Sequence, residues 1–134
     1  MNKILQPKGW IEPSGYANGM AATGHMVFVG GQIGWNHENR FESDDFLEQI
    51  RQALQNVVSV LAEAGAKPHH LVSMTWYFTN KQDYKQNLRA LGEIYREIIG
   101  PHYPAMAALE VSSLIEDRAK IEIQAIAVIP EKRT

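Results

Sequence analysis

The sequence predicts a single α+β domain that spans residues 1–134 and folds in the order β-β-α-β-α-β-β. Two segments repeat apolar residues at helical spacing, and a third alternates apolar and polar residues at strand spacing. Further extended segments lie before the first helix and after the second. Because two amphipathic helices must each cover an apolar surface, we expect one mixed sheet with both helices on one face. A chain of this length buries about two thirds of its unfolded surface, so it needs no disulfide to fold.

The first half of the chain predicts two strands and a helix. The strands are expected over residues 16–22 and 25–30, on either side of a Thr23-Gly24 turn. The helix is expected over residues 46–64, with Ser43 as its N-cap and Gly65 at its end. Its apolar residues recur at intervals of three and four, as on one buried helical face: Phe46, Leu47, Ile50, Ala53, Leu54, Val57, Val58 and Leu61.

The second half predicts a strand over residues 70–79, a second helix over 84–98 and two final strands. Thr79 or Asn80 is the expected cap of that helix, and Gly100-Pro101 ends it. Its buried face is expected to hold Tyr84, Leu88, Leu91, Ile94, Tyr95 and Ile98. The last two strands are expected over 105–111 and 119–129, joined by a loop.

The face of the sheet that the helices leave open is expected to be apolar. In the last strand, Ile121, Ile123, Ala125 and Ala127 form one side, whereas Glu122, Gln124, Ile126 and Val128 form the other. The open side would then carry Ile126, Val128, Leu71, Tyr77 and Met106. Such a patch predicts a subunit interface, with scattered surface residues of a monomer as the alternative.

The composition disfavours several classes of function. The chain has no cysteine, so thiolate chemistry is unavailable and the reducing cytoplasm is the expected location. No apolar stretch reaches the ~18 residues of a membrane span, and the first ten residues do not resemble a signal peptide, so no membrane partner is expected. The 13 basic residues are dispersed and the net charge is −2, which disfavours binding to nucleic acid.

Histidines and glutamates are the candidates for chemistry. The best candidate ligands for a metal ion are His69, His70, His37 and Glu38. Adjacent histidines at the start of a strand point to opposite faces, and no HExxH spacing occurs, so solvated histidines and no metal are expected. Glu110 and Glu122 each interrupt an apolar strand. For Glu122, a catalytic role and a cross-strand or intersubunit salt bridge both remain open.

Four segments resemble motifs of the RidA/YjgF family and together frame most of residues 16–128. They are similar to the family's early Gly-Pro-Tyr, its strand ending in Gly-Gln-Ile, its Pro-Ala-Arg-Ser-x-Val-Glu-Val and its closing strand. The last two matches are the most specific. The segments are Ser14-Gly15-Tyr16, Val27-Phe28-Val29-Gly30-Gly31-Gln32-Ile33, Pro104-Ala105 with Leu109-Glu110-Val111, and Lys120-Ile121-Glu122-Ile123-Gln124-Ala125-Ile126-Ala127-Val128.

This resemblance implies a chorismate-mutase-like homotrimer with helices outside, sheets inside and ligand clefts between subunits. It also implies a cofactor-free hydrolase that releases ammonia from reactive enamines and imines. By position, Tyr16 would line the cleft, the backbone of Gly31 would border it, and Glu122 would position water. The expected partners are therefore further copies of the chain and a small-molecule ligand.

The arginine with which the family binds the substrate carboxylate is missing. Met106 stands at its position, Ala107 and Ala108 follow, and Gly92 replaces the usual asparagine. Losing such a charge pair costs about 2–5 kcal/mol, or roughly 30- to 4000-fold. We therefore expect little deaminase activity on small amino-acid imines, unless Arg118 or Arg89 replaces the missing group.

Three functions follow from these residues. One expectation is a more apolar cleft for a different ligand, formed by Met106, Ala108, Trp35 and Tyr103. The alternative is that Met106 partly closes the cleft. The protein would then hydrolyse an imine or enamine, or act as a non-catalytic sensor or scavenger. An RNase or translation inhibitor is disfavoured by the dispersed basic residues and by the lack of a histidine acid/base pair.

Overall fold

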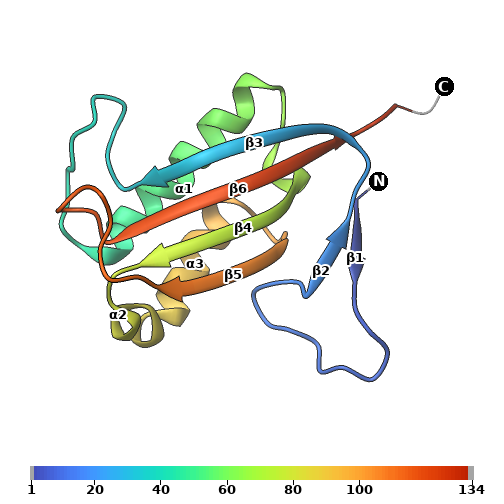
Figure 1. Ribbon diagram of the computed structural model, residues 1–134, viewed down its shortest axis with the longest axis horizontal. Coiled ribbons are helices and arrows are strands. Elements are labelled where there is room, and N and C mark those ends of the chain that lie inside the picture. The colour runs from blue at the N-terminus through green and yellow to red at the C-terminus, as the bar shows by residue number, and fades with distance from the viewer. Residues whose placement is uncertain (1, 133–134) are drawn as a thin grey trace.

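The computed structural model describes residues 2–132 and consists of a small strand pair, a four-stranded sheet and a layer of helices (Figure 1). The pair joins β1 (Lys3–Leu5) to β2 (Gly19–Ala21). The main sheet has the order β3-β6-β4-β5, with β3 Gly24–Ile33, β4 Leu71–Phe78, β5 Ala105–Glu110 and β6 Ile121–Pro130. The helical elements are α1 Phe46–Glu63, the 3-10 turn η1 Pro68–His70, α2 Lys81–Gln86 and α3 Leu88–Ile98.

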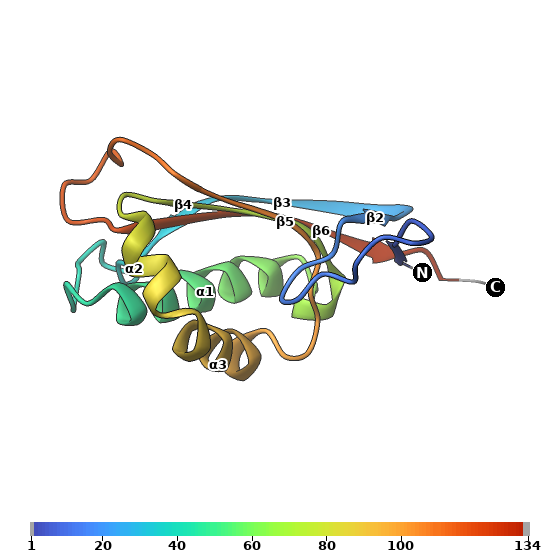
Figure 2. The ribbon, with the colours of Figure 1, turned by 90° about the horizontal axis from the view of Figure 1, so that it is seen from below.

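Both main helices lie on one face of the sheet. Strands β4 and β5 run parallel, whereas β6 is antiparallel to β3 and to β4. Figure 2 shows α1 and α3 below the sheet, and no helix of residues 2–132 covers the face above it. The predicted α+β fold with one mixed main sheet and two main helices is therefore confirmed.

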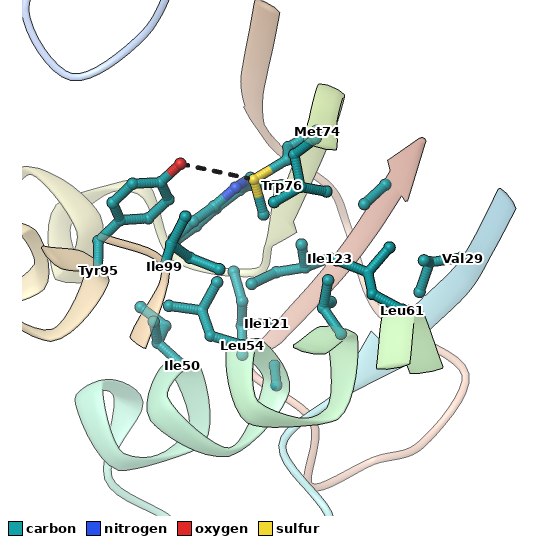
Figure 3. Close-up of a cluster of buried hydrophobic side chains, with 14 of the residues drawn as sticks. Val29, Ile50, Leu54, Leu61, Met74, Trp76, Tyr95, Ile99, Ile121 and Ile123 are labelled. Carbon is teal, nitrogen blue, oxygen red and sulfur yellow. Dashed lines mark hydrogen bonds between the residues drawn. The ribbon is translucent and has the colours of Figure 1, made fainter. Parts of the chain in front are cut away.

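The core lies between this sheet and the helices (Figure 3). The four residues of β6 predicted to face inward are all buried in it, together with the apolar stripe of α1. Burying one such aliphatic side chain contributes about 1.5–3 kcal/mol. The ring of Tyr95 reaches in from α3, and its hydroxyl lies 3.9 Å from Met74 Sδ. The core thus ties α3 to the middle of the sheet.

Helix α1 begins at Phe46 as predicted, but its N-cap lies two residues after the predicted one. The N-cap is Asp45, whose carboxylate accepts a hydrogen bond from the Glu48 N–H at 3.0 Å. The predicted cap, Ser43, instead accepts from the Asp45 N–H and shapes the preceding turn. The predicted end is confirmed, because Gly65 adopts a positive φ of 73° just after the helix.

The predicted second helix is wrong in one respect, because Asn87 divides it into α2 and α3. In a continuous helix, Asp83 O would accept a hydrogen bond from the Asn87 backbone N–H. Here the Asn87 side-chain amide donates to Asp83 O instead, at 2.7 Å. The Asn87 N–H turns to Tyr84 O instead. As a result Leu88, predicted to be buried, is 53 % exposed at the start of α3. The predicted cap Asn80 is confirmed by its bonds to the N–H groups of residues 82 and 83.

The predicted first strand does not join the main sheet. Only Gly19–Ala21 of the predicted segment is a strand, and it pairs with β1, which was not predicted. The next strand runs past its predicted end to Ile33, with a register shift between Val29 and Gln32. Gly30 and Gly31 lie at this shift and form a β-bulge at the edge of the sheet.

Two residues predicted for the open face are buried within the chain. A bulge between Leu71 and Ser73 reverses the alternation at the start of β4, so Leu71 faces the core. Val128 does lie on the predicted side, opposite Met26, but only 3 % of it is exposed. The apolar open face therefore consists chiefly of Met26, Phe28, Tyr77, Leu109 and Ile126.

Gln49 is the one buried polar side chain described in residues 2–132 and joins α1 to two loops. Its Nε2 donates to Ser43 O and Arg118 O at 3.1 and 3.0 Å, and its Oε1 accepts from the Lys120 N–H at 2.8 Å. Gln49→Leu keeps the volume but leaves these three buried groups unpaired. We expect the free energy of unfolding to fall by about 3–5 kcal/mol. Urea unfolding at fixed protein concentration tests this, with the exposed Gln55→Leu on the same helix as control.

Candidate functional site

A pocket of about 550 Å³ opens between the helical layer and the edge strand β5. Helix α3 and Tyr84 of α2 form one wall, Trp76 of β4 and two residues of β5 form the floor, and segment 14–16 forms the rim. Its lining residues are Ser14, Gly15, Tyr16, Trp76, Tyr84, Leu88, Leu91, Gly92, Tyr95, Arg96, Tyr103, Met106 and Ala108. The pocket is thus mainly apolar and aromatic, which is typical of small-molecule sites.

The parallel register of β4 and β5 decides which residues of β5 reach the pocket. Met106 pairs with Met74, and Ala108 with Trp76, so both lie on the helix-covered face. The expectation that Met106 belongs to the open face is therefore wrong. Ala107 alternates to the other side of the strand and does not line the pocket. Tyr16 reaches the same pocket because the Ala17 N–H donates to Pro104 O at 2.9 Å, which fixes this segment beside β5.

Aromatic rings form much of the pocket wall. Tyr95 and Tyr103 stack with centroids 5.2 Å apart, and the Tyr95 hydroxyl donates to His102 O at 2.6 Å. Burial raises the pKa of Tyr95, with a further contribution from Tyr103, and burial also raises the pKa of Tyr84. Both phenols therefore stay protonated at neutral pH and cannot serve as anionic bases there.

Arg96 is the only charged residue in the lining of this pocket. The two arginines that the sequence suggested as replacements for the carboxylate-binding arginine do not line the pocket. Arg118 donates to Asp44 Oδ1 at 2.9 Å and lies over the ring of Phe41, whereas Arg89 is 96 % exposed at its side chain and pairs with Glu93. Arg96 was not among the predicted site residues, although its spacing of four residues from the mid-helix Gly92 is visible in the sequence.

Gly31 and Glu122 form a second group on the open face of the sheet. A methyl group built on Gly31 would lie 2.1 Å from Glu122 Oε2, so the backbone of Gly31 closely approaches the carboxylate. Glu122 pairs with Tyr77 in the register of β4 and β6. None of the salt bridges formed within residues 2–132 includes Glu122. Its carboxylate is therefore not held by the cross-strand ion pair that the sequence left open.

The predicted site residues thus fall into two groups within one chain. Tyr16, Met106 and Ala108 share the pocket, whereas Gly31 and Glu122 lie on the opposite face of the sheet. Three further candidates do not line the pocket, namely Ala107, Trp35 and Glu110. Trp35 packs against Phe41 with centroids 5.9 Å apart. The Glu110 carboxylate accepts the Lys81 N–H at 2.7 Å at the start of α2, which is a structural role.

The adjacent histidines His69 and His70 lie together in a short turn. His69 and His70 lie in η1 with ring centroids 4.2 Å apart, so the expectation that they point to opposite faces is wrong. His70 Nδ1 accepts the Lys67 N–H at 2.9 Å, and burial lowers the pKa of His70. Among residues 2–132, no three His, Asp or Glu side chains converge as metal ligands. No helix in the same range is long and apolar enough to cross a membrane.

Comparisons with known proteins match this fold and this chain length. The family model described as Endoribonuclease L-PSP matches residues 11–129. A RutC family protein of Pyrococcus abyssi is 33 % identical over 87 % of this chain and 88 % of its own. The Escherichia coli K12 protein named "Putative reactive intermediate deaminase TdcF" is 31 % identical over 96 % of this chain and 98 % of its own.

Solved structures of related proteins have the same fold as this chain. A Rid family protein of unknown function from Yersinia pestis, YyfB, superposes with a TM-score of 0.84 at 28 % identity, covering 96 % of this chain and 98 % of that one. E. coli TdcF with bound serine superposes with a TM-score of 0.67 at 30 % identity, covering 95 % and 98 %.

The fold and the pocket define a small α+β domain with a preformed, mainly apolar and aromatic pocket at a sheet edge. This chain belongs to the RidA/YjgF family, whose model carries the description Endoribonuclease L-PSP.

Proposed function

We propose that three copies of this chain assemble through their open sheet faces and hydrolyse a small reactive imine or enamine in clefts between subunits. The supporting observation is the separation of the two residue groups. The pocket holds Tyr16 and Met106 but no carboxylate to position water, and Glu122 lies on the other face of the sheet. A neighbouring copy would bring Glu122 and Gly31 to the pocket and complete the site.

The proposed reaction uses water and no cofactor. Water adds to the imine carbon, so that a C–O bond forms while Glu122 accepts the water proton. Glu122 passes this proton to the nitrogen, which gives a carbinolamine. The hydroxyl proton of the carbinolamine then moves to the amine nitrogen as the C–N bond breaks, which releases ammonia and a carbonyl product. An enamine reaches the same path after protonation at carbon gives the imine. Tyr16 and the protonated phenols of the wall would line the cleft, and the Gly31 backbone would fix the carboxylate.

A non-catalytic binding protein is the second candidate, because Met106 stands where the resemblance implies a substrate-binding arginine. Ammonia release separates the two functions directly. Cleavage of RNA, which the description of the family model suggests, receives less support, since no histidine lines the pocket and the net charge is −2. We therefore propose hydrolysis of an imine or enamine.

Met106→Arg tests whether a cation at this position restores binding of the substrate carboxylate. With the imine generated from alanine by an amino-acid oxidase, we expect the wild-type protein to raise ammonia release by less than about twofold. Met106→Arg is expected to add about tenfold, less than a full charge pair provides, because Ala107 and Ala108 cannot hold the guanidinium by hydrogen bonds.

Two further variants complete this test. Met106→Leu, which conserves volume without charge, should show no gain. A gain in Met106→Arg that survives Glu122→Ala would remove Glu122 from the mechanism. Strong wild-type activity on this small imine would contradict the expectation that Met106 has weakened the grip.

A further inference from the structure

The pocket has one cation and no compensating anion. Among the residues that line it, Arg96 is charged and no aspartate or glutamate is present. Arg96 is exposed and takes part in none of the salt bridges formed within residues 2–132. Its neighbours on α3 differ, because Arg89 is paired with Glu93, and Glu97 with Arg51. The guanidinium of Arg96 is therefore available to an anionic ligand.

The guanidinium of Arg96 lies beside Gly92 at the pocket wall. Arg96 follows Gly92 by one helical turn, and a methyl group built on Gly92 would lie 3.5 Å from Arg96 Nη1. The guanidinium therefore lies over the bare backbone of Gly92, on the side of α3 that faces the pocket. A methyl group at this distance would be in ordinary van der Waals contact with the guanidinium, so the place of Arg96 at the pocket follows from its position on α3.

The rest of the pocket suits a ligand larger than the imine of a small amino acid. A volume of about 550 Å³ falls in the range of sites for drug-sized ligands, roughly 300–1,000 Å³. Trp76, Tyr84, Tyr95 and Tyr103 supply ring surfaces, and Leu91 and Met106 supply aliphatic ones. Apart from Arg96, the pocket holds only neutral side chains.

We infer that Arg96 binds the carboxylate of the ligand, and that the pocket selects an imine or enamine with an aromatic or bulky apolar body. Arg96 would thus supply from α3 the cation that Met106 lacks on β5. This inference rests on the proposed function for the reactive group, but the binding of the acid and of the apolar body can be measured without turnover. A guanidinium forms forked bonds to a carboxylate and also packs against aromatic rings, so it suits both parts of such a ligand.

Three stable carbonyl analogues of imines separate charge from size. Phenylpyruvate carries the aromatic body and the carboxylate, its methyl ester keeps the body without the charge, and pyruvate keeps the charge without the body. Calorimetric titration of the wild-type protein should show phenylpyruvate binding about 10- to 100-fold more tightly than the ester, and more tightly than pyruvate. Arg96→Gln should abolish the preference for the acid over the ester and leave the ester affinity unchanged.

Two variants on the same helix control this result. Arg89→Gln removes an exposed arginine outside the pocket and should leave all three affinities unchanged. Arg96→Lys should keep part of the preference for the acid, since it keeps the charge but loses the fork. An acid-to-ester ratio near one in the wild-type protein, or a ratio that persists in Arg96→Gln, would overturn the inference. Pyruvate binding as tightly as phenylpyruvate would overturn the size selection.

Ammonia release from the imine of phenylalanine, generated by an amino-acid oxidase, distinguishes failure of this inference from failure of the proposed function. Binding that depends on Arg96 without any acceleration of ammonia release would leave the inference in place and refute hydrolysis. Acceleration that is equal in wild type and Arg96→Gln, with no preference for the acid, would support hydrolysis and refute the role of Arg96.

Discussion

Phe28→Asp is expected to convert the proposed trimer into a monomer without unfolding the subunit. Phe28 lies on the edge strand β3 opposite Ile126, on the open sheet face, and is 67 % exposed in the single chain. An aspartate at this position remains solvated in the monomer, so the fold should tolerate it. In an assembly that covers this face, the same carboxylate would be buried without a partner, at a cost of about 3–5 kcal/mol for each subunit.

Light scattering at micromolar concentration measures this effect directly. We expect a trimer for the wild-type protein and a monomer for Phe28→Asp, with similar far-UV circular dichroism for both. Val60→Asp, which places the same charge on the exposed side of α1, should remain a trimer. Val128→Asp is a poor test, because Val128 is already buried within the chain and its substitution would disturb the fold itself. A wild-type monomer, or an unchanged Phe28→Asp trimer, would exclude this face as the interface.

The periodic elements were predictable from the sequence because their patterns depend on neighbours a few residues away. The apolar stripe of residues 46–63 and the inward side of β6 are local patterns, and both are confirmed. The errors arose where one residue changes the local geometry. The side-chain amide of Asn87 donates to a carbonyl that would otherwise accept a backbone hydrogen bond of the helix. The bulge at residue 72 turns Leu71 to the other face of the sheet.

The candidate site was less predictable because it depends on how distant segments meet. The face on which Met106 lies is set by its parallel pairing with β4, which no local pattern of β5 reveals. Arg96 has an ordinary position on an amphipathic helix, and only the packing of α3 beside β5 places it at the pocket. The side of β6 on which Glu122 lies was predictable from strand alternation, but Gly31 could be placed in advance only by resemblance, and the two approach each other next to the bulge in β3.

Gly31→Ala is expected to reduce the proposed imine hydrolysis about 100-fold while the subunit remains folded. The added methyl group would lie 2.1 Å from Glu122 Oε2 and 2.7 Å from its Cδ, so the carboxylate must rotate away. The clash is with a flexible side chain, so the cost to stability is small. A displacement of about 1 Å in a group that positions water is enough for a loss of this size.

The adjacent glycine provides the matched control for this prediction. A methyl group on Gly30 would meet no atom within 4 Å, so Gly30→Ala should keep the wild-type rate of ammonia release from the imine of phenylalanine. In the Glu122→Ala background, Gly31→Ala should cost little more, because the group that it displaces is already gone. Independent, additive losses in that double variant would show that Gly31 acts on something other than Glu122. Full activity of Gly31→Ala alone would show that the observed position of the carboxylate is not the one that catalysis requires.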